Sequence, residues 1–113
     1  MAECAGLLYL ARELDGLPMC GVIDATARMT PRLTLGYRDA VAAGSSVLTP
    51  AGAAVRGHEF HRTTVAAGDG VTPAWAYLGK KEGFVQGGVH ASYLHLHWAG
   101  YPGLARRLMA AAA

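Results

Sequence analysis

Two segments of the chain carry side chains that could perform nucleophilic chemistry. Cys4 stands directly before a helix-forming run that begins at Ala5, and a histidine-rich segment, HASYLHLHW, covers residues 90–98. A cysteine at a helix N-terminus lies close to unpaired backbone N–H groups and to the positive end of the helix dipole, which both favour the thiolate over the thiol. Because the thiolate is the attacking species, this pattern predicts a nucleophile at Cys4. Gly6 would let the turn approach a substrate closely.

Cys4 has a second interpretation, as a small buried hydrophobe, which is the role of most free cysteines. Spacing alone does not separate the two. The segment after Cys4 has the periodicity of a buried amphipathic helix, with apolar residues at i, i+3, i+4 and i+7. These residues are Leu7, Leu10, Ala11 and Leu14. Asp15–Gly16 and Pro18 are expected to end the helix.

The rest of the chain is predicted to be mostly strands and loops, without an internal repeat. Alternation places Leu33, Leu35 and Tyr37 on the buried face of a strand at 32–38. Further strands are expected at 19–23 and 55–64 and from Phe84 onward, with a glycine-bearing loop at 66–72. An Ala-rich helix at 101–112 is expected to end the chain.

Length and composition limit what the chain can be. With 113 residues, of which 52% are hydrophobic and 16% charged, it is long enough for one modest globular domain and too short for two. The net charge is +2 and no dense Lys/Arg run occurs, so we expect neither nucleic acid nor a membrane as a partner. No apolar run of about 18 residues exists, and Glu3 stands where a signal peptide would carry positive charge. We therefore expect a cytoplasmic protein.

Neither the cysteines nor the histidines form a pattern typical of a structural site. Cys4 and Cys20 do not make a disulfide framework, and Cys20 is predicted to be buried in a strand within the apolar run 17–23. Five histidines stand at positions 58, 61, 90, 95 and 97. Their spacing lacks the helical i, i+4 pair of a zincin, and no carboxylate or cysteine cluster completes a ligand set, so we expect no metal site.

Four blocks of sequence occur in a characteristic order. They are ECAGLLYLARELDGLPMCGV from residue 3, ARMTPRLTLGYRDAV from residue 27, RGHEFHRT from residue 56 and EGFVQGGVHASYLHLHWAG from residue 82. Each block alone is weak, but the combination is specific. The chain resembles the C-terminal part of the class I glutamine amidotransferase-like domain of the cobyrinic (or hydrogenobyrinic) acid a,c-diamide synthase family, which amidates corrins in cobalamin biosynthesis.

The resemblance implies roles for individual residues. It places the nucleophile at Cys4 and the general base and acid at His95, and the N–H of Ala5 is one plausible oxyanion donor. Many amidotransferases of this class carry a glutamate two residues after the histidine to orient it, but here that residue is His97. Glu59 is one candidate for the orienting role. A surface or structural carboxylate is an equal alternative for Glu59.

The fold class implied is α/β, strand-rich with two flanking helices, and we expect residues 1–113 to form the C-terminal half of a truncated glutaminase domain. Only three residues precede Cys4, fewer than the usual strand of about 5 to 6 residues. No phosphate-binding G-x-x-x-x-G-K-[ST] motif occurs, so an ATP-binding synthetase domain is absent from this chain. The parent enzyme would use glutamine, ATP and Mg²⁺, and the corrin substrate would bind the synthetase domain. By itself the chain is expected to be inactive and to self-associate through an exposed sheet edge.

Two alternatives remain open at this stage. One is a sister amidotransferase on the same fold, such as cobyric acid synthase. The other is a non-catalytic, truncated domain that binds a partner. The sequence also leaves open whether the corrin contains cobalt.

Overall fold

A computed structural model describes residues 1–113. It contains ten strands, two α-helices and one 3-10 turn, and no helix is both long and apolar enough to cross a membrane. The strands are β1 (Ala2–Glu3), β2 (Glu13–Leu14), β3 (Leu17–Pro18), β4 (Ala25–Ala42), β5 (Ala54–Ala67), β6 (Trp75–Tyr77), β7 (Lys80–Glu82), β8 (Phe84–Gln86), β9 (Val89–Ser92) and β10 (His95–Leu96). The helices are α1 (Ala5–Leu10) and α2 (Pro102–Ala112), and the 3-10 turn is η1 (Trp98–Gly100).

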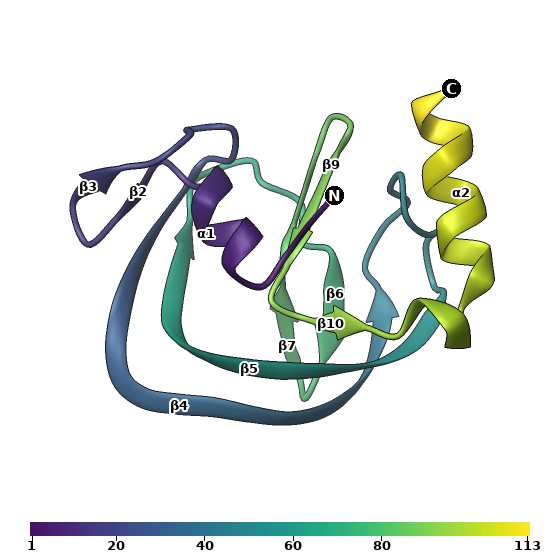
Figure 1. Ribbon diagram of the computed structural model, residues 1–113, viewed down its shortest axis with the longest axis horizontal. Coiled ribbons are helices and arrows are strands. Elements are labelled where there is room, and N and C mark those ends of the chain that lie inside the picture. The colour runs from purple at the N-terminus through teal and green to yellow at the C-terminus, as the bar shows by residue number, and fades with distance from the viewer.

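One long, bent hairpin dominates the architecture (Figure 1). β4 has 18 residues and pairs antiparallel with the 14-residue β5, and both strands curve around the rest of the chain. The register shifts between Met29 and Thr34, where Pro31 lies. Proline has no N–H to donate to the neighbouring strand, so it interrupts the ladder of hydrogen bonds at this point. Such an irregularity also bends the strand.

Shorter strands complete two sheets. The larger sheet has the order β10-β5-β4-β2-β3, with the β6–β7 hairpin attached to the C-terminal end of β4. The smaller sheet has the order β1-β9-β8, in which β1 runs parallel to β9. Because β9 leads into β10 within three residues, the chain passes from the small sheet to the edge of the large one.

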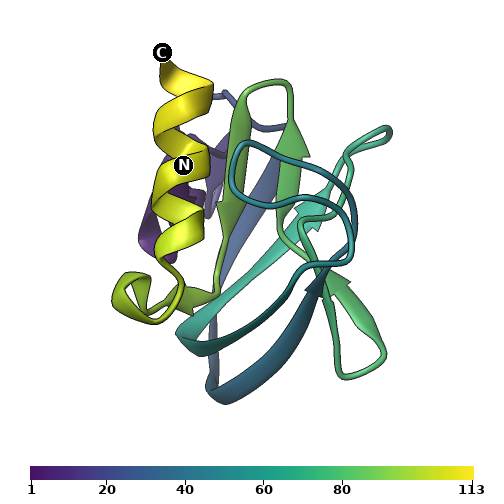
Figure 2. The same ribbon diagram turned by 90° about the vertical axis from the view of Figure 1, so that its right-hand side faces the viewer.

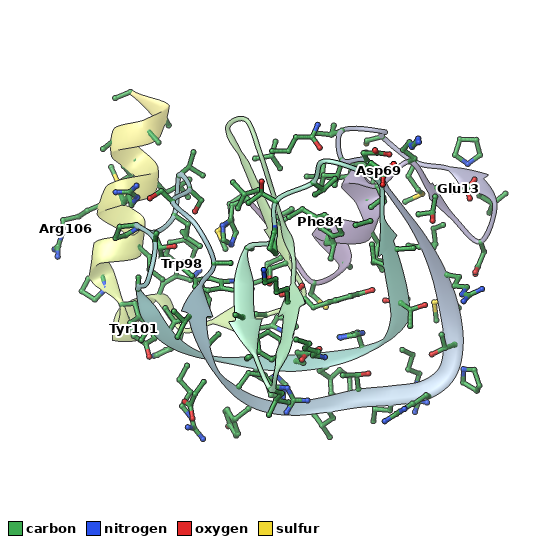
Figure 3. All side chains as sticks on the ribbon, turned by 180° about the vertical axis from the view of Figure 1, so that it is seen from behind. Glu13, Asp69, Phe84, Trp98, Tyr101 and Arg106 are labelled. Carbon is green, nitrogen blue, oxygen red and sulfur yellow. The ribbon has the colours of Figure 1, made fainter.

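Two apolar cores lie on the inner side of the hairpin. One gathers around α1 and contains Leu7, Ile23 and Phe84, whose ring lies beside the helix in Figure 3. The other lies toward α2, around the fully buried Trp75. Figure 2 shows α2 standing along one side of the molecule. Trp98 and Tyr101 pack against this second core near the start of α2, while Arg106 points away from the body of the protein (Figure 3).

The predicted architecture is confirmed in outline, with a strand-rich α/β fold, two helices and strands covering 32–38, 55–64 and the residues from Phe84. The first helix is shorter than its periodicity predicts. α1 ends at Leu10 because Ala11 already has an extended backbone, with φ −64° and ψ 170°. Leu14 lies in β2, which Asp15 and Gly16, with φ values of 52° and 77°, join to β3 in a hairpin. A hairpin with two positive φ values is a tight turn that competes with helix extension.

Two further expectations were wrong. Residues 19–23 do not form a strand, and Cys20 is exposed rather than buried. In β4, Leu35 and Tyr37 were expected on the buried face but are 54% and 70% exposed. The inner face of the hairpin here holds polar side chains, namely the buried Glu59 and the half-buried Arg38, so the apolar residues of the alternating pattern point outward.

Gly57 fixes how closely β10 can approach β5. It pairs with Leu96, and a Cβ at this position would collide with the Leu94 side chain and lie 2.9 Å from the His95 carbonyl oxygen. Because the backbone of β10 cannot move aside without breaking its ladder, Gly57→Ala should lower the free energy of unfolding by about 1–3 kcal/mol. Chemical denaturation would measure it.

The matched control is Gly88→Ala. A Cβ at Gly88 would point into open space, and its φ is not left-handed, so this substitution should change the free energy of unfolding by less than about 0.5 kcal/mol. If both substitutions changed the free energy of unfolding by the same amount, the close approach of β10 to Gly57 would not limit the size of this residue.

Candidate active site

Cys4 occupies a sharp turn between a strand and a helix. β1 ends at Glu3, α1 begins at Ala5, and Cys4 between them has φ 53° and ψ −114°. Such a conformation costs a non-glycine residue about 1–3 kcal/mol and persists only when the surroundings hold it. The holding contact is the hydrogen bond from the Cys4 N–H to the carbonyl oxygen of Ser92, at 2.8 Å. A nucleophile on a strained strand–turn–helix junction is exposed to substrate, as in a nucleophile elbow.

The surroundings of Cys4 favour the thiol over the thiolate. Burial raises the pKa of Cys4, the neighbouring Glu3 carboxylate raises it further, and the Ala5 N–H lowers it by a smaller amount than burial raises it. Sγ lies 3.8 Å from the carbonyl oxygen of Phe60. The expectation that the helix N-terminus would favour the thiolate was therefore wrong, because burial outweighs the backbone N–H of this six-residue helix. A base must remove the proton before Cys4 can attack.

His95 lies on β10 with its ring orientation set by the backbone of β5. It pairs with His58, and its Nδ1 is 3.0 Å from the His58 carbonyl oxygen. A carbonyl oxygen only accepts hydrogen bonds, so Nδ1 must carry the proton. In the neutral imidazole the lone pair is then on Nε2, which is the tautomer that a general base needs. Thus a backbone carbonyl, rather than a carboxylate, orients His95.

The same edge of β5 brings Cys4 and His95 together. The carbonyls of His58 and Phe60 are two residues apart in the strand, so they point to the same side and are separated by about 6.8 Å. His95 contacts the first and Cys4 contacts the second. A further link joins their neighbours, since the Leu96 N–H donates to Oε2 of Glu3 at 3.2 Å. The two candidate catalytic residues thus come from opposite ends of the sequence and contact neighbouring carbonyls along one edge of β5.

Glu59 faces the inner side of the hairpin and is engaged elsewhere. Oε1 accepts from Nε of Arg38 at 3.0 Å, and Oε2 accepts from Nε2 of His61 at 2.7 Å. Burial alone would raise the pKa of Glu59, but its side-chain hydrogen bonds, that of His61 first, together with the Lys80 charge hold the pKa below its ordinary value. Gly36 lies opposite Glu59, and a side chain there would collide with the Arg38 guanidinium that crosses it. The interpretation of Glu59 as a structural carboxylate fits these contacts, and its two oxygens are not directed at His95.

The remaining sequence candidates occupy distinct places. The Ala5 N–H lies close enough to Sγ of Cys4 to act on its pKa. His97 is exposed and precedes η1, whereas His95 is half-buried. The contact between the His58 carbonyl and His95 could not be predicted from the sequence, because every residue has a backbone carbonyl and no residue type marks the one that is used.

Comparisons with known proteins identify the family to which the fold and the sequence are similar. The sequence model of the CobB/CobQ-like glutamine amidotransferase domain matches residues 1–102. The crystal structure of a glutamine amidotransferase superposes with a TM-score of 0.71 at 26% identity, covering 97% of this chain and 58% of that one.

Several curated relatives cover nearly the whole chain. The hydrogenobyrinate a,c-diamide synthase of Streptomyces coelicolor is 67% identical over 111 residues, which are 96% of this chain and 23% of that protein. The enzyme of the same name from Mycobacterium tuberculosis is 56% identical over 99% of this chain and 26% of its own length. The cobyrinate a,c-diamide synthase of Gloeobacter violaceus is 43% identical over 96% of this chain and 25% of its own length. The chain spans about a quarter of the length of these relatives.

The raised pKa of Cys4 predicts its reactivity in the absence of substrate. In a Cys20→Ser variant, where Cys4 is the one remaining thiol, the rate of alkylation by iodoacetamide should rise with pH and reach half its maximum above about 8.5, the value of a free thiol. The reason is that only the thiolate reacts, and burial opposes its formation.

A synthetic peptide containing one cysteine serves as the control in the same buffers. If Cys4 reached half its maximal alkylation rate at a pH well below that of the peptide, burial would not control its pKa. The helix N-terminus would then have the larger effect on that pKa.

Proposed function

This chain belongs to the CobB/CobQ-like glutamine amidotransferase domain family, and we propose that Cys4 and His95 hydrolyse glutamine to release ammonia. The ammonia would serve the ATP-dependent amidation of the a- and c-carboxylates of cobyrinic or hydrogenobyrinic acid. The observation that carries the proposal is the convergence of Cys4 and His95 on neighbouring carbonyls of β5. The names of the relatives supply the corrin substrate class and favour a,c-diamide synthesis over the cobyric acid synthase alternative.

In the first half of the reaction, Nε2 of His95 accepts the proton of Cys4, and Sγ attacks the side-chain amide carbon of glutamine. The amide oxygen becomes an oxyanion, and we assign the Ala5 N–H as its donor. The hydrogen bond by which this N–H lowers the pKa of Cys4 supports the assignment. His95 then returns the proton to the departing nitrogen, the C–N bond breaks, and ammonia leaves. A glutamyl thioester remains on Cys4.

In the second half, His95 accepts a proton from water, and the resulting hydroxide attacks the thioester carbonyl. The same oxyanion donor serves again, the C–S bond breaks, and glutamate leaves. The proton held by His95 returns to Sγ. Throughout, the hydrogen bond from Nδ1 to the His58 carbonyl keeps Nε2 directed at the reacting atoms and stabilises the imidazolium that forms.

ATP and Mg²⁺ have no step in this part of the mechanism. The chain contains no group of three or more His, Cys, Asp or Glu side chains that could hold a metal ion. The proposal assigns the ATP-dependent activation of the corrin carboxylates to a separate synthetase domain, with glutamine as the ligand of the present domain.

The test protein for the proposal is a chimera, in which this chain replaces the matching segment of the Streptomyces coelicolor relative. Cys4→Ser in the chimera should abolish glutamine-dependent amidation and leave amidation with added ammonium salts within about twofold of the unchanged chimera. The reason is that Cys4 releases ammonia and takes no part in carboxylate activation. The measurement is corrin amide formation with each nitrogen source.

The same assay separates this proposal from a non-catalytic role. If the unchanged chimera amidates with ammonia but never with glutamine, the domain does not act as a glutaminase. If Cys4→Ser abolishes both activities while the protein stays folded, Cys4 acts elsewhere in the reaction.

The two neighbouring histidines provide a second test. His95→Ala should slow thioester formation on Cys4 by about 100-fold or more, the usual contribution of a general base. His97→Ala is the matched control, because His97 is exposed and follows two residues later, and it should change the rate by less than about threefold. Rapid-quench measurement of the glutamyl adduct reports this step. A larger loss in the His97 variant would show that the base has been assigned to the wrong histidine.

A further inference from the structure

The segment Ser92–Leu94 joins the two halves of the proposed active site. The Ser92 carbonyl accepts the N–H of Cys4 at 2.8 Å and so holds the strained turn. Three residues after Ser92 the chain reaches His95. Any group that fixes Ser92–Leu94 therefore fixes the position of Cys4 relative to His95.

Glu82, the last residue of β7, makes the contacts that fix this segment. Oε2 accepts a hydrogen bond from the Ser92 hydroxyl at 2.6 Å, and Oε1 accepts one from the Tyr93 N–H at 2.8 Å. The Ser92 Oγ in turn accepts the N–H of Leu94 at 2.9 Å. The carboxylate thus binds two consecutive residues directly and a third through the Ser92 hydroxyl, at the point where the chain passes from the small sheet to the edge of the large one.

Gly83 allows Glu82 to come this close. It adopts φ +78°, and a Cβ there would lie 2.8 Å from Cβ of Ala74 and 2.9 Å from the carbonyl oxygen of Ala91. A larger residue would force the end of β7 away from β9. The Glu82–Gly83 pair is therefore built for close packing against the strand that carries Ser92.

The ionised form of Glu82 matches these contacts, because both oxygens accept hydrogen bonds and neither donates. Burial raises the pKa of Glu82, while the bonds from Ser92 and Tyr93 lower it by smaller amounts. Burying a carboxylate is unfavourable unless its hydrogen bonds compensate. If residue 82 only filled space, an apolar side chain would do so without the desolvation cost of a carboxylate. The two hydrogen bonds of Glu82 therefore indicate that it holds Ser92 and Tyr93 in position.

Building on the proposed function, we propose that Glu82 is a positioning residue for the glutaminase reaction. It acts through Ser92 and Tyr93, and holds the Cys4 turn and the His95 strand in the relative placement that proton transfer needs. It contacts neither the substrate nor the reacting atoms.

The test is Glu82→Gln in the chimera. Glutamine has nearly the same shape but replaces one acceptor oxygen by an NH₂ group, so it cannot accept from both Ser92 and Tyr93. We expect kcat for glutamine hydrolysis to fall at least about 10-fold, because small misplacements of reacting groups have effects up to about 100-fold. The KM for glutamine should change less than about threefold, and ammonia-dependent amidation should stay within about twofold.

A second readout does not depend on activity. Hydrogen exchange at the Cys4 amide should become at least about 10-fold faster in Glu82→Gln, because the Ser92 carbonyl that protects it is no longer held. Glu13→Gln on β2 is the control for the loss of one carboxylate, and it should leave both the exchange rate and kcat unchanged.

The outcomes separate the two proposals. Unchanged exchange at Cys4, an unchanged kcat, or a parallel fall of the glutamine- and ammonia-dependent activities in Glu82→Gln would overturn the positioning role. If the unchanged chimera shows no Cys4-dependent glutaminase activity, the proposed function fails, while the exchange measurement still decides whether Glu82 holds the Cys4 turn.

Discussion

The hydrogen bond from the Cys4 amide to the Ser92 carbonyl is the interaction on which the rest of the site depends. Cys4 has a backbone conformation that is unfavourable for any residue with a side chain, and this bond, together with the parallel pairing of β1 and β9, holds it. The same strand that supplies the carbonyl continues into the segment that carries His95. A strained turn and a half-buried histidine are therefore positioned by one piece of backbone, which explains how residues from opposite ends of the chain can meet with defined geometry.

The bent hairpin supplies the other boundary of the site. Its strand β5 presents two carbonyls at one edge, one to His95 and one to the Cys4 thiol, and its inner face carries the buried ion pair between Glu59 and Arg38. A buried ion pair contributes little net stability, because desolvation of both charges offsets their attraction. We infer that its value lies in specifying the hairpin register, since Glu59 can reach Arg38 only where Gly36 leaves room. Register at this point determines which carbonyls face β10.

The sequence alone predicted the outline of the fold and the identity of the candidate residues, but most contacts within the site could not be predicted from it. Alternation and helix signals located β4, β5 and α2, and the family resemblance indicated Cys4 and His95. Periodicity failed at Leu14 because the positive φ values of Asp15 and Gly16 form a turn that local spacing does not reveal. It failed again at Leu35 and Tyr37, because the apolar side of the strand faces outward where the interior holds a polar cluster. The raised pKa of Cys4, the carbonyl that orients His95 and the contacts of Glu82 all depend on long-range burial and backbone placement, which no residue type encodes.

We propose that the Cys4 turn forms a glutamine-reactive site, and a diazoketone analogue of glutamine would react covalently with such a site. The chain has one further cysteine, Cys20, which is exposed and lies outside the strained turn, so it serves as an internal control within the same molecule. Peptide mass spectrometry after incubation of the chimera with the analogue would locate the covalent label. We expect stoichiometric labelling of Cys4, suppressed by excess glutamine, and no labelling of Cys20. Labelling of both cysteines at similar rates, or labelling of Cys4 that glutamine does not suppress, would contradict it.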